Sequence, residues 1–272
     1  PLEVSAEKLT TIYRVVRKLR SKNYDWVFDF HGLLKSGVAS FLSGAERRVG
    51  YSRSKSRECN HWFQSILLRN PLDPTMPRIL KYLQMVRSFS PDYEFNREVV
   101  RPQLPKLSAP RDVLARATNR EYAIFHPFTS HSRYGKAKEW GPKNNTKFLE
   151  QFLRDINQSV RITWGPGEKS RALELSDRID HPNLKVAPRT KTLRDLAFFV
   201  QNASLVVSVD TSIAHITDFL GRPLVMLFGG SSYTVNSPLF TEYRALFPQQ
   251  KDQKTEGIEP HVAIKKVKDL LD

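Results

Sequence analysis

Four side chains that could bind a ligand follow one apolar run in the second half of the chain. The run from Leu205 to Val209 leads directly into Asp210, Thr211 and Ser212, and His215 comes three residues later. Asp, Thr and Ser are common first residues of helices, and the free N–H groups of a helix N-terminus bind anions. The pattern therefore suits a phosphate group. The alternative is that Asp210 and Thr211 only cap a helix while His215 packs against a sheet.

The residues around this group predict a strand, a helix and a second strand. Apolar residues recur at helical spacing from Ile213 to Leu220, and Gly221 favours the end of a helix. A second apolar run, Leu224–Phe228, ends at Gly229-Gly230. This order predicts a right-handed βαβ unit with Asp210 and the glycine pair at one sheet edge, where open α/β sheets bind ligands. The glycines would let their loop approach a ligand closely.

The stretch resembles the signature of the family 9 glycosyltransferases, the bacterial lipopolysaccharide heptosyltransferases. The matching pattern is Asp-Thr-x-x-x-His over residues 210–215, followed by Gly-x-Pro and Phe-Gly. The resemblance implies a GT-B fold, in which two Rossmann-like doubly wound α/β domains face a cleft. It also implies that Asp210 binds heptose hydroxyls, that Thr211 and Ser212 bind phosphate, and that His215 supports the loop.

The second half of the chain repeats strand and helix patterns. Besides the two runs above, strands are predicted at 122–126, 160–164 and 184–187, and five such strands make a Rossmann-like sheet. We assign the nucleotide-sugar-binding domain to residues 111–257. Residues 258–272 form a predicted helix, which in two-domain transferases of this type packs back toward the first domain.

A long basic loop follows the strand at 122–126. It contains Thr129, Ser130 and Lys138, whose hydroxyl and ammonium groups suit a diphosphate. Loops of this length are usually functional. The resemblance to the family's Thr-Thr and Lys-x-Trp elements implies that these three residues bind phosphate, with Lys136 as a competitor for the role of Lys138. From the residues alone, a solvated loop is the alternative.

Two further residues are candidates for the nucleoside. Glu168 ends a Gly-Pro-Gly turn after the strand at 160–164, where its carboxylate could accept both hydroxyls of a ribose. The resemblance gives Glu168 that role, and the alternative is a glutamate that only favours a helix N-terminus. Lys191 precedes the next helix, and its backbone would border the base.

Residues 1–110 are predicted to form a partial N-terminal domain on the acceptor side. Residues 6–19 have an amphipathic basic pattern, typical of a packed surface helix or of a helix that touches a membrane. The stretch that contains Asp29 and residues 32–36 resembles heptosyltransferase I, although His31 stands where glutamine is more usual. Strands are also predicted at 24–30, 47–51 and near Val99, and helices at 33–42 and 77–89.

Three cations of this domain are candidate acceptor ligands. Arg53 and Arg57 lie in a polar segment of alternating serines and cations, which predicts an exposed loop that could reach an acidic ligand. Arg57-Glu58 resembles a family Arg-Glu pair near the sugar-acid acceptor, and Lys35 lies in the stretch that resembles heptosyltransferase I. The alternative is charge that is merely solvated.

Composition narrows the function classes. A chain of 272 residues suits two domains, and its net charge of +15 implies an acidic partner such as nucleic acid, an anionic membrane surface or a phosphorylated substrate. Nucleic-acid-binding motifs are absent, and no Gly-x-Gly-x-x-Gly follows a predicted strand, which disfavours a dehydrogenase or epimerase. The single Cys59 and the unpaired histidines predict no disulfide within the chain and no metal site.

We therefore predict a metal-independent glycosyltransferase that moves L-glycero-D-manno-heptose from ADP-heptose to the Kdo residues of the lipid A inner core. ADP-heptose is the donor substrate and no cofactor is predicted. We expect a monomer, peripheral to the cytoplasmic face of the inner membrane, that binds Kdo-lipid A and no nucleic acid. The alternatives are heptosyltransferase II or another family 9 transferase with a different acceptor and, more distantly, a basic nucleic-acid-binding module.

No catalytic residue is assigned. The chain begins with Pro1 and not with Met, so we expect that an N-terminal part is missing. The resemblance implies that the general base, an Asp in the loop after the family's first strand, lies upstream of this chain.

Overall fold

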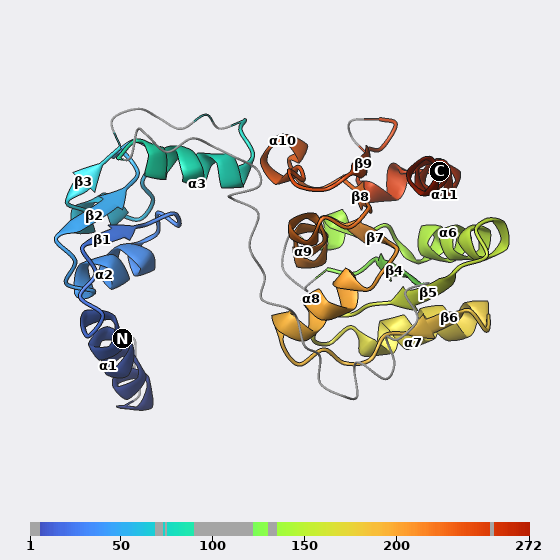
Figure 1. Cartoon of the computed structure of the whole chain (residues 1–272), viewed down its shortest axis with the longest axis horizontal. Helices are drawn as coiled ribbons and strands as arrows, with labels where there is room; N and C mark the ends of the chain where they lie inside the picture. Colours follow the sequence, from blue (N-terminus) through green and yellow to red (C-terminus); the bar gives the residue numbers. More distant parts are fainter. Residues whose placement is uncertain (1–5, 69–72, 74, 90–121, 130–134, 251–252) are drawn as a thin grey trace. The chain divides into compact units, whose positions relative to one another are not determined.

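The computed structural model describes residues 6–68, 73, 75–89, 122–129, 135–250 and 253–272. The chain divides into two compact units, Pro1–Phe95 and Asn96–Asp272 (Figure 1). The domain boundary predicted near residue 110 and the strand predicted near Val99 lie outside the described residues.

The first unit contains a small parallel sheet with the strand order β1-β2-β3. Its strands are β1 (Trp26–Phe28), β2 (Arg47–Gly50) and β3 (Ile66–Leu67). Its helices are α1 (Ala6–Arg20), α2 (Leu34–Leu42), the 3-10 helix η1 (Asn60–Phe63) and α3 (Arg78–Arg87). The strands and helices predicted between residues 6 and 89 are confirmed, and only η1 and the two-residue β3 were not predicted. Val49, Leu68 and Met85 form the buried centre.

The second unit is built on a six-stranded parallel sheet with the order β6-β5-β4-β7-β8-β9. Its strands are β4 (Tyr122–His126), β5 (Ser159–Ile162), β6 (Leu184–Val186), β7 (Leu205–Val209), β8 (Leu224–Leu227) and β9 (Tyr243–Leu246). The five predicted strands are confirmed. The sixth, β9, was not predicted, because it is an edge strand with the half-buried sequence Tyr-Arg-Ala followed by one buried leucine. An apolar run of the kind that marks a central parallel strand is therefore missing.

Helices cover both faces of this sheet (Figure 1). One core cluster joins the sheet to α6, α7 and α11, and the other joins it to α8 and α9. Successive residues of β4 point to opposite clusters: Ala123 and Phe125 lie in the first, and Tyr122 and Ile124 in the second. The helices are α6 (Pro142–Asp155), α7 (Lys169–Ile179), α8 (Leu193–Gln201), α9 (Ser212–Leu220), α10 (Tyr233–Asn236) and α11 (Pro260–Leu271), with 3-10 helices η2 (Lys136–Lys138) and η3 (Thr255–Gly257).

The predicted C-terminal helix is α11. Its residues Ala263, Ile264 and Val267 are buried in the same cluster as residues of α6 and the sheet, so α11 is an integral part of the second unit. Its predicted packing toward the first domain stays a prediction.

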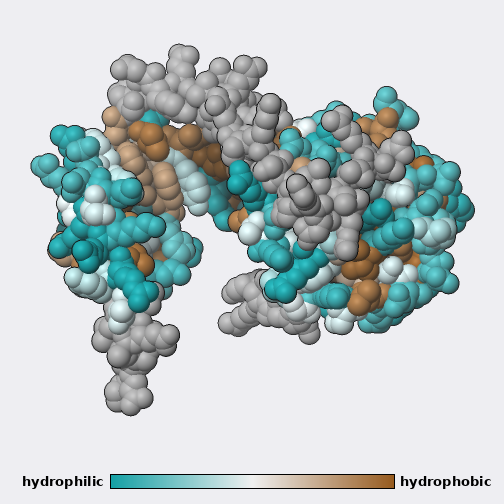
Figure 2. All heavy atoms as spheres, turned by 60° about the horizontal axis from the view of Figure 1, so that its bottom comes forward, coloured by the Kyte–Doolittle hydropathy of each residue, from teal (hydrophilic) through white to brown (hydrophobic). Residues whose placement is uncertain are grey.

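The surface of the second unit is mostly hydrophilic in the view of Figure 2, with apolar residues in small areas. Within the described residues, no helix combines the length and the apolar content needed to cross a membrane.

Candidate functional site

The strand order of the second unit reverses between β4 and β7. These two strands are parallel neighbours, paired through Phe125 with Val207 and His126 with Ser208. The strand after β4 in sequence lies on one side of the pair and the strand after β7 on the other. Chain segments therefore leave the two carboxyl ends in different directions, which opens a crevice where doubly wound sheets bind ligands.

A cleft of about 1440 Å³ lies at this position. It is lined by most of the predicted nucleotide-sugar residues, namely Thr129, Lys138, Glu168, Lys191, Asp210, Thr211 and Ser212. Ser130 lies outside the described residues, and the side chain of Lys136 is not described. The structure thus brings together side chains that are spread over more than eighty positions of the sequence.

The N-terminus of α9 presents backbone N–H groups to this cleft. The first N–H bonded within the helix is that of Ala214, which donates to the Thr211 carbonyl at 3.1 Å. The preceding residues Thr211, Ser212 and Ile213 line the cleft. N–H groups in the first helical turn and the helix dipole favour a bound anion.

Thr211 occupies the N-cap position of α9, but its side chain makes no capping hydrogen bond. Its hydroxyl lies 3.3 Å from Oγ of Ser208. Asp210 does not cap the helix either, because the partners of its carboxylate are the side chains of Lys138, Asn236 and His215. The capping alternative is therefore not what the structure shows for these two residues.

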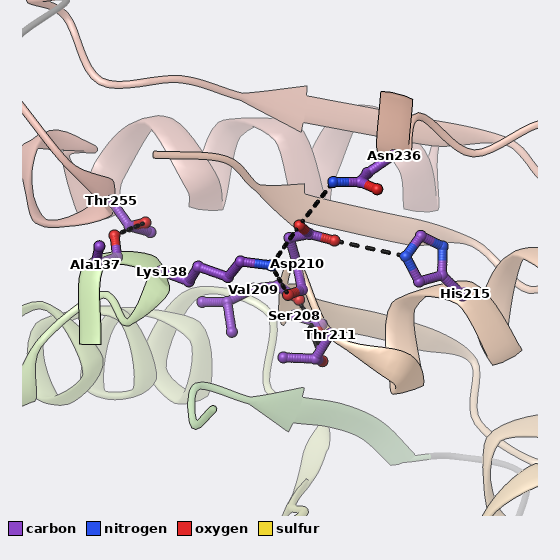
Figure 3. Close-up of polar contacts among 9 residues, drawn as sticks. All are labelled: Ala137, Lys138, Ser208, Val209, Asp210, Thr211, His215, Asn236 and Thr255. Atoms are coloured by element: carbon purple, nitrogen blue, oxygen red, sulfur yellow. Dashed lines mark hydrogen bonds and ion pairs between the residues drawn. The ribbon is translucent and has the colours of Figure 1, made fainter. Parts of the chain in front are cut away.

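Asp210 is the centre of a polar cluster (Figure 3). Its Oδ2 accepts hydrogen bonds from Nζ of Lys138 at 2.9 Å and from Nδ2 of Asn236 at 3.2 Å. Nε2 of His215 lies 3.5 Å from Oδ1. The side chain of Asp210 is only 4% exposed, so these donors replace the water that would otherwise solvate its charge.

The electrostatic environment keeps Asp210 ionised. Burial by itself raises the pKa of the carboxyl, but His215, the Ser231 hydroxyl and Lys138 lower it by more, so that the pKa lies well below its ordinary value. A carboxylate with so low a pKa is a weak proton acceptor at neutral pH. Asp210 can thus accept hydrogen bonds from a ligand but is poorly suited to act as a general base.

Lys138 is held in place by close backbone packing. The carbonyl of Ala137 accepts a hydrogen bond from Oγ1 of Thr255 at 3.2 Å (Figure 3). A Cβ on Gly229 would lie 1.9 Å from the backbone nitrogen of Thr255, and one on Gly230 would lie 2.8 Å from the Ala137 carbonyl oxygen. The close approach expected of the glycine pair is therefore made to the protein's own backbone, and its expected approach to a ligand stays a prediction.

Glu168 lies on another side of the cleft, at the start of α7. It is buried, and its Oε2 accepts a hydrogen bond from the N–H of Gly165 at 2.6 Å. It occupies the N-cap position without a side-chain capping bond. Its carboxylate therefore closes the preceding turn, and Glu168 lines the cleft. The alternative, a glutamate that only favours the helix N-terminus, is compatible with this position.

The backbone at Lys191 is fixed by a capping box. Oδ2 of Asp195 accepts hydrogen bonds from the N–H groups of Lys191 and Thr192, both at 2.9 Å, and the Asp195 N–H donates back to Oγ1 of Thr192 at 3.1 Å. The next residue, Leu193, is 71% exposed and lines the cleft. This edge therefore offers a rigid backbone and an apolar side chain.

Several residues that line the cleft, or that contact residues lining it, were not predicted. Burial lowers the pKa of His126 to about 4, and its Nδ1 lies 3.0 Å from Oγ1 of Thr163. Asn236 comes from the short helix α10, which has no apolar periodicity. Glu139 and Arg171 form an ion pair beside Thr129. The sequence carried no signal for these residues, because their partners are distant along the chain.

The candidate acceptor residues belong to the first unit. Lys35 lies on α2, and Arg53 and Arg57 lie between β2 and η1. All three are exposed, which was predicted for the loop of Arg53 and Arg57. The N–H of Arg57 donates to the Gly32 carbonyl at 3.1 Å, so the basic loop is fixed against the turn that follows β1. Whether these cations bind an acceptor stays a prediction.

Asp29 organises that same turn. Its Oδ1 accepts hydrogen bonds from the N–H groups of His31 at 3.0 Å and Gly32 at 3.1 Å. Its Oδ2 accepts from Nδ2 of Asn60 at 2.7 Å and Nε2 of Gln64 at 3.2 Å. The buried carboxylate therefore joins the end of β1 to η1.

Among the residues that the structure describes, no group of three or more His, Cys, Asp or Glu side chains is placed to hold a metal ion.

Comparisons of the sequence and of the structure with known proteins both find heptosyltransferases. The sequence model of glycosyltransferase family 9 (heptosyltransferase) matches residues 12–263. Lipopolysaccharide heptosyltransferase 1 of Salmonella typhimurium is 26% identical over 221 residues, which cover 78% of this chain and 63% of that relative. The chain therefore spans less than two thirds of that relative's length.

Two further similarities extend over the whole chain. Lipooligosaccharide heptosyltransferase 2 of Haemophilus influenzae is 23% identical and is aligned over 100% of this chain and 83% of its own length. The structure of the Escherichia coli heptosyltransferase WaaC with ADP superposes with a TM-score of 0.76 at 19% identity, covering 98% of this chain and 79% of that one. This likeness shows the predicted GT-B fold.

Proposed function

Because the chain belongs to glycosyltransferase family 9, we propose that it transfers L-glycero-D-manno-heptose from ADP-heptose to a Kdo residue of the lipid A inner core. The observation that carries the proposal is the ion pair of Lys138 and Asp210 beside the N-terminus of α9, at the crevice between β4 and β7. The similarity to a lipopolysaccharide heptosyltransferase 1 supports the choice of donor and acceptor.

The phosphate side of the proposed donor site is positively polarised. Lys138, Thr129 and residues 211–213 all line the cleft, and they carry an ammonium group, a hydroxyl and the N–H groups of a helix N-terminus. When the bond from the sugar to ADP breaks, negative charge develops on the diphosphate. Donors that are already in place stabilise that charge without needing to reorganise. The proposal therefore assigns the departure of ADP to Lys138 and the α9 N-terminus, with no metal ion.

Asp210 would bind the hydroxyls of the heptose. Its low pKa makes it a hydrogen-bond acceptor, and Asn236 and His215 already occupy positions around its two oxygens. A sugar hydroxyl would join or replace one of these donors. On the other side of the cleft, Glu168 would accept the ribose hydroxyls, and the backbone at Lys191 would border the base. No residue is proposed as the general base.

The acceptor would be bound by the first unit. Kdo carries a carboxylate and lipid A carries phosphates, and Lys35, Arg53 and Arg57 offer exposed cationic groups to such anions. The proposal includes a monomer without nucleic-acid partners, peripheral to the cytoplasmic face of the inner membrane, where the lipid anchor of the acceptor would be held.

A calorimetric titration with ADP, with NAD and UDP as controls, tests the donor site. We expect binding that is selective for ADP and that is lost in Glu168→Ala. Equal binding of all three nucleotides, or full ADP binding by Glu168→Ala, would contradict the proposed site. The exposed Glu174 on the same helix provides the matched control, because Glu174→Ala should bind ADP like the wild type.

A second candidate function is transfer to an acceptor that already carries a heptose. The similarity to a heptosyltransferase 2 over the whole chain favours it. Assays with ADP-heptose and either Kdo-lipid A or heptosyl-Kdo-lipid A separate the two. ADP release only with Kdo-lipid A supports the first function, and release only with the heptosylated acceptor supports the second.

A further inference from the structure

A bidentate ion pair lies beside the cleft, on the side of Thr129. Nη1 of Arg171 donates to Oε1 of Glu139 at 3.0 Å, and Nη2 donates to Oε2 at 2.5 Å. The side chains are 35% and 16% exposed, so the pair is partly shielded from water. Two parallel hydrogen bonds fix the orientation of both groups as well as their distance. The first turn of α7 is thereby joined to the residue that follows η2.

Glu139 also holds the start of the segment that follows β4. Its Oε1 accepts a hydrogen bond from the backbone N–H of Thr129 at 3.1 Å, and Oγ1 of Thr129 lies 3.4 Å away. On the other side of the pair, the guanidinium carbon of Arg171 lies 4.7 Å from the ring centroid of Phe128. The ion pair therefore contacts two consecutive residues: Arg171 lies over the ring of Phe128, and Glu139 bonds to Thr129.

The segments joined in this way carry three residues of the proposed donor site. Lys138 directly precedes Glu139, and Glu168 lies one helical turn before Arg171. We infer that Glu139 and Arg171 are positioning residues that hold Thr129 and Lys138 in place for the diphosphate of the donor. The inference rests on the proposed function, because it needs a diphosphate at this cleft.

The charges of the pair predict unequal effects for its two members. Burial raises the pKa of Glu139, but the hydrogen bonds from Arg171 and Thr129 lower it by more, so the carboxyl stays ionised. Arg171 compensates this negative charge. Loss of Arg171 would leave an uncompensated carboxylate near the diphosphate and repel it, whereas Glu139→Gln removes the charge and keeps an acceptor for the Thr129 N–H.

The experiment is a double-mutant cycle on nucleotide affinity. ADP and adenosine are titrated into the wild type, Glu139→Gln, Arg171→Gln and the double variant. We expect Arg171→Gln to weaken ADP binding about tenfold or more and Glu139→Gln about threefold, with the double variant close to Glu139→Gln. Adenosine, which has no phosphate, should bind all four proteins within about twofold.

Arg178→Gln is the matched control. Arg178 forms an exposed ion pair with Glu174 on the same helix, with Nη2 2.7 Å from Oε1. This variant loses a guanidinium–carboxylate pair that is not placed at the cleft, so its ADP affinity should equal that of the wild type. Thermal unfolding of all variants shows whether each is folded at the titration temperature.

The outcomes separate the inference from the proposed function. If the wild type binds ADP and all variants bind it equally well, or if ADP and adenosine weaken together, the positioning role is overturned while the proposed donor site stands. If the wild type binds no ADP, the proposed function is overturned and the inference with it. A double variant that binds ADP more weakly than Arg171→Gln would overturn the charge argument.

Discussion

Nζ of Lys138 lies 2.9 Å from Oδ2 of Asp210, and this ion pair joins residues that are 72 positions apart in the chain. Asp210 directly follows β7, and Lys138 ends η2, the 3-10 helix of the segment that follows β4. The pair therefore bridges the crevice where the strand order reverses.

Lys138→Met should weaken ADP binding about tenfold or more, because a charge-assisted contact to the diphosphate is lost. The buried carboxylate of Asp210 would also lose one hydrogen-bond partner, so the free energy of unfolding should fall by about 1–2 kcal/mol. Calorimetric titration and urea unfolding measure the two effects. Lys147→Met, on the exposed face of α6, is the control. ADP affinity at the wild-type level would contradict the assignment of Lys138.

Below neutral pH, the free energy of unfolding should depend on the protonation of His126. Burial lowers the pKa of His126 from 6.5 to about 4 in the folded chain. Between these values the unfolded chain binds the proton more readily, so acid favours unfolding. As the pH falls from about 7 to about 4, we expect the wild type to lose on the order of 1–3 kcal/mol more than His126→Gln does.

Urea unfolding at pH 7, 5.5 and 4.5 measures this difference. His261→Gln is the control, because His261 is exposed on α11 and should give the wild-type dependence on pH. Parallel pH profiles for the wild type and His126→Gln would show that the folded chain does not keep His126 neutral.

Asp218→Ala should strongly destabilise the second unit. The buried carboxylate accepts hydrogen bonds from three consecutive backbone N–H groups, those of Leu239 at 2.9 Å, Phe240 at 2.7 Å and Thr241 at 3.1 Å. Alanine would leave these donors without an acceptor. We expect a loss of about 3 kcal/mol or more in the free energy of unfolding. Asp177→Ala, exposed on α7, should change it by less than about 0.5 kcal/mol. Equal stabilities would contradict the role of Asp218.

Gly229→Ala should be more destabilising than Gly230→Ala. The added Cβ would lie 1.9 Å from the Thr255 nitrogen at position 229 and 2.8 Å from the Ala137 carbonyl oxygen at position 230. Both neighbours are backbone atoms, so the main chain itself must move. We expect a cost of about 2 kcal/mol or more for Gly229→Ala and a smaller one for Gly230→Ala, measured by urea unfolding. If Gly230→Ala were more destabilising than Gly229→Ala, the tighter packing of Gly229 against Thr255 would be contradicted.

Much of the second unit could be predicted from local sequence patterns. β7 and β8 are central parallel strands, which are buried on both faces and therefore need continuous apolar runs. The helix end at Gly221 was also predictable, because the C-cap has a φ of 64°, where glycine is favoured. The edge strand β9 and the two-residue β3 escaped prediction, since neither is long or apolar enough to stand out.

The candidate site was predictable as a set of residues but not as a set of contacts. Their types and spacing, together with the family resemblance, pointed to Thr129, Lys138, Glu168 and Asp210, and all four line one cleft. Nothing local indicated that Asp210 would bond to Asn236, or that Glu139 would hold Thr129. The glycine pair was expected to allow a close approach, and nothing local indicated that the backbone of Thr255 and Ala137 would make one.

The sequence by itself determined most of the strands and helices and the polar residues that follow them, because those properties depend on neighbours within a few positions. Only the tertiary structure decided which side chains meet. The order β6-β5-β4-β7-β8-β9 brings the ends of β4 and β7 together across some eighty residues of chain. That order follows from packing the whole sheet between two layers of helices, so the partners of Asp210 and of Glu139 are consequences of the complete fold.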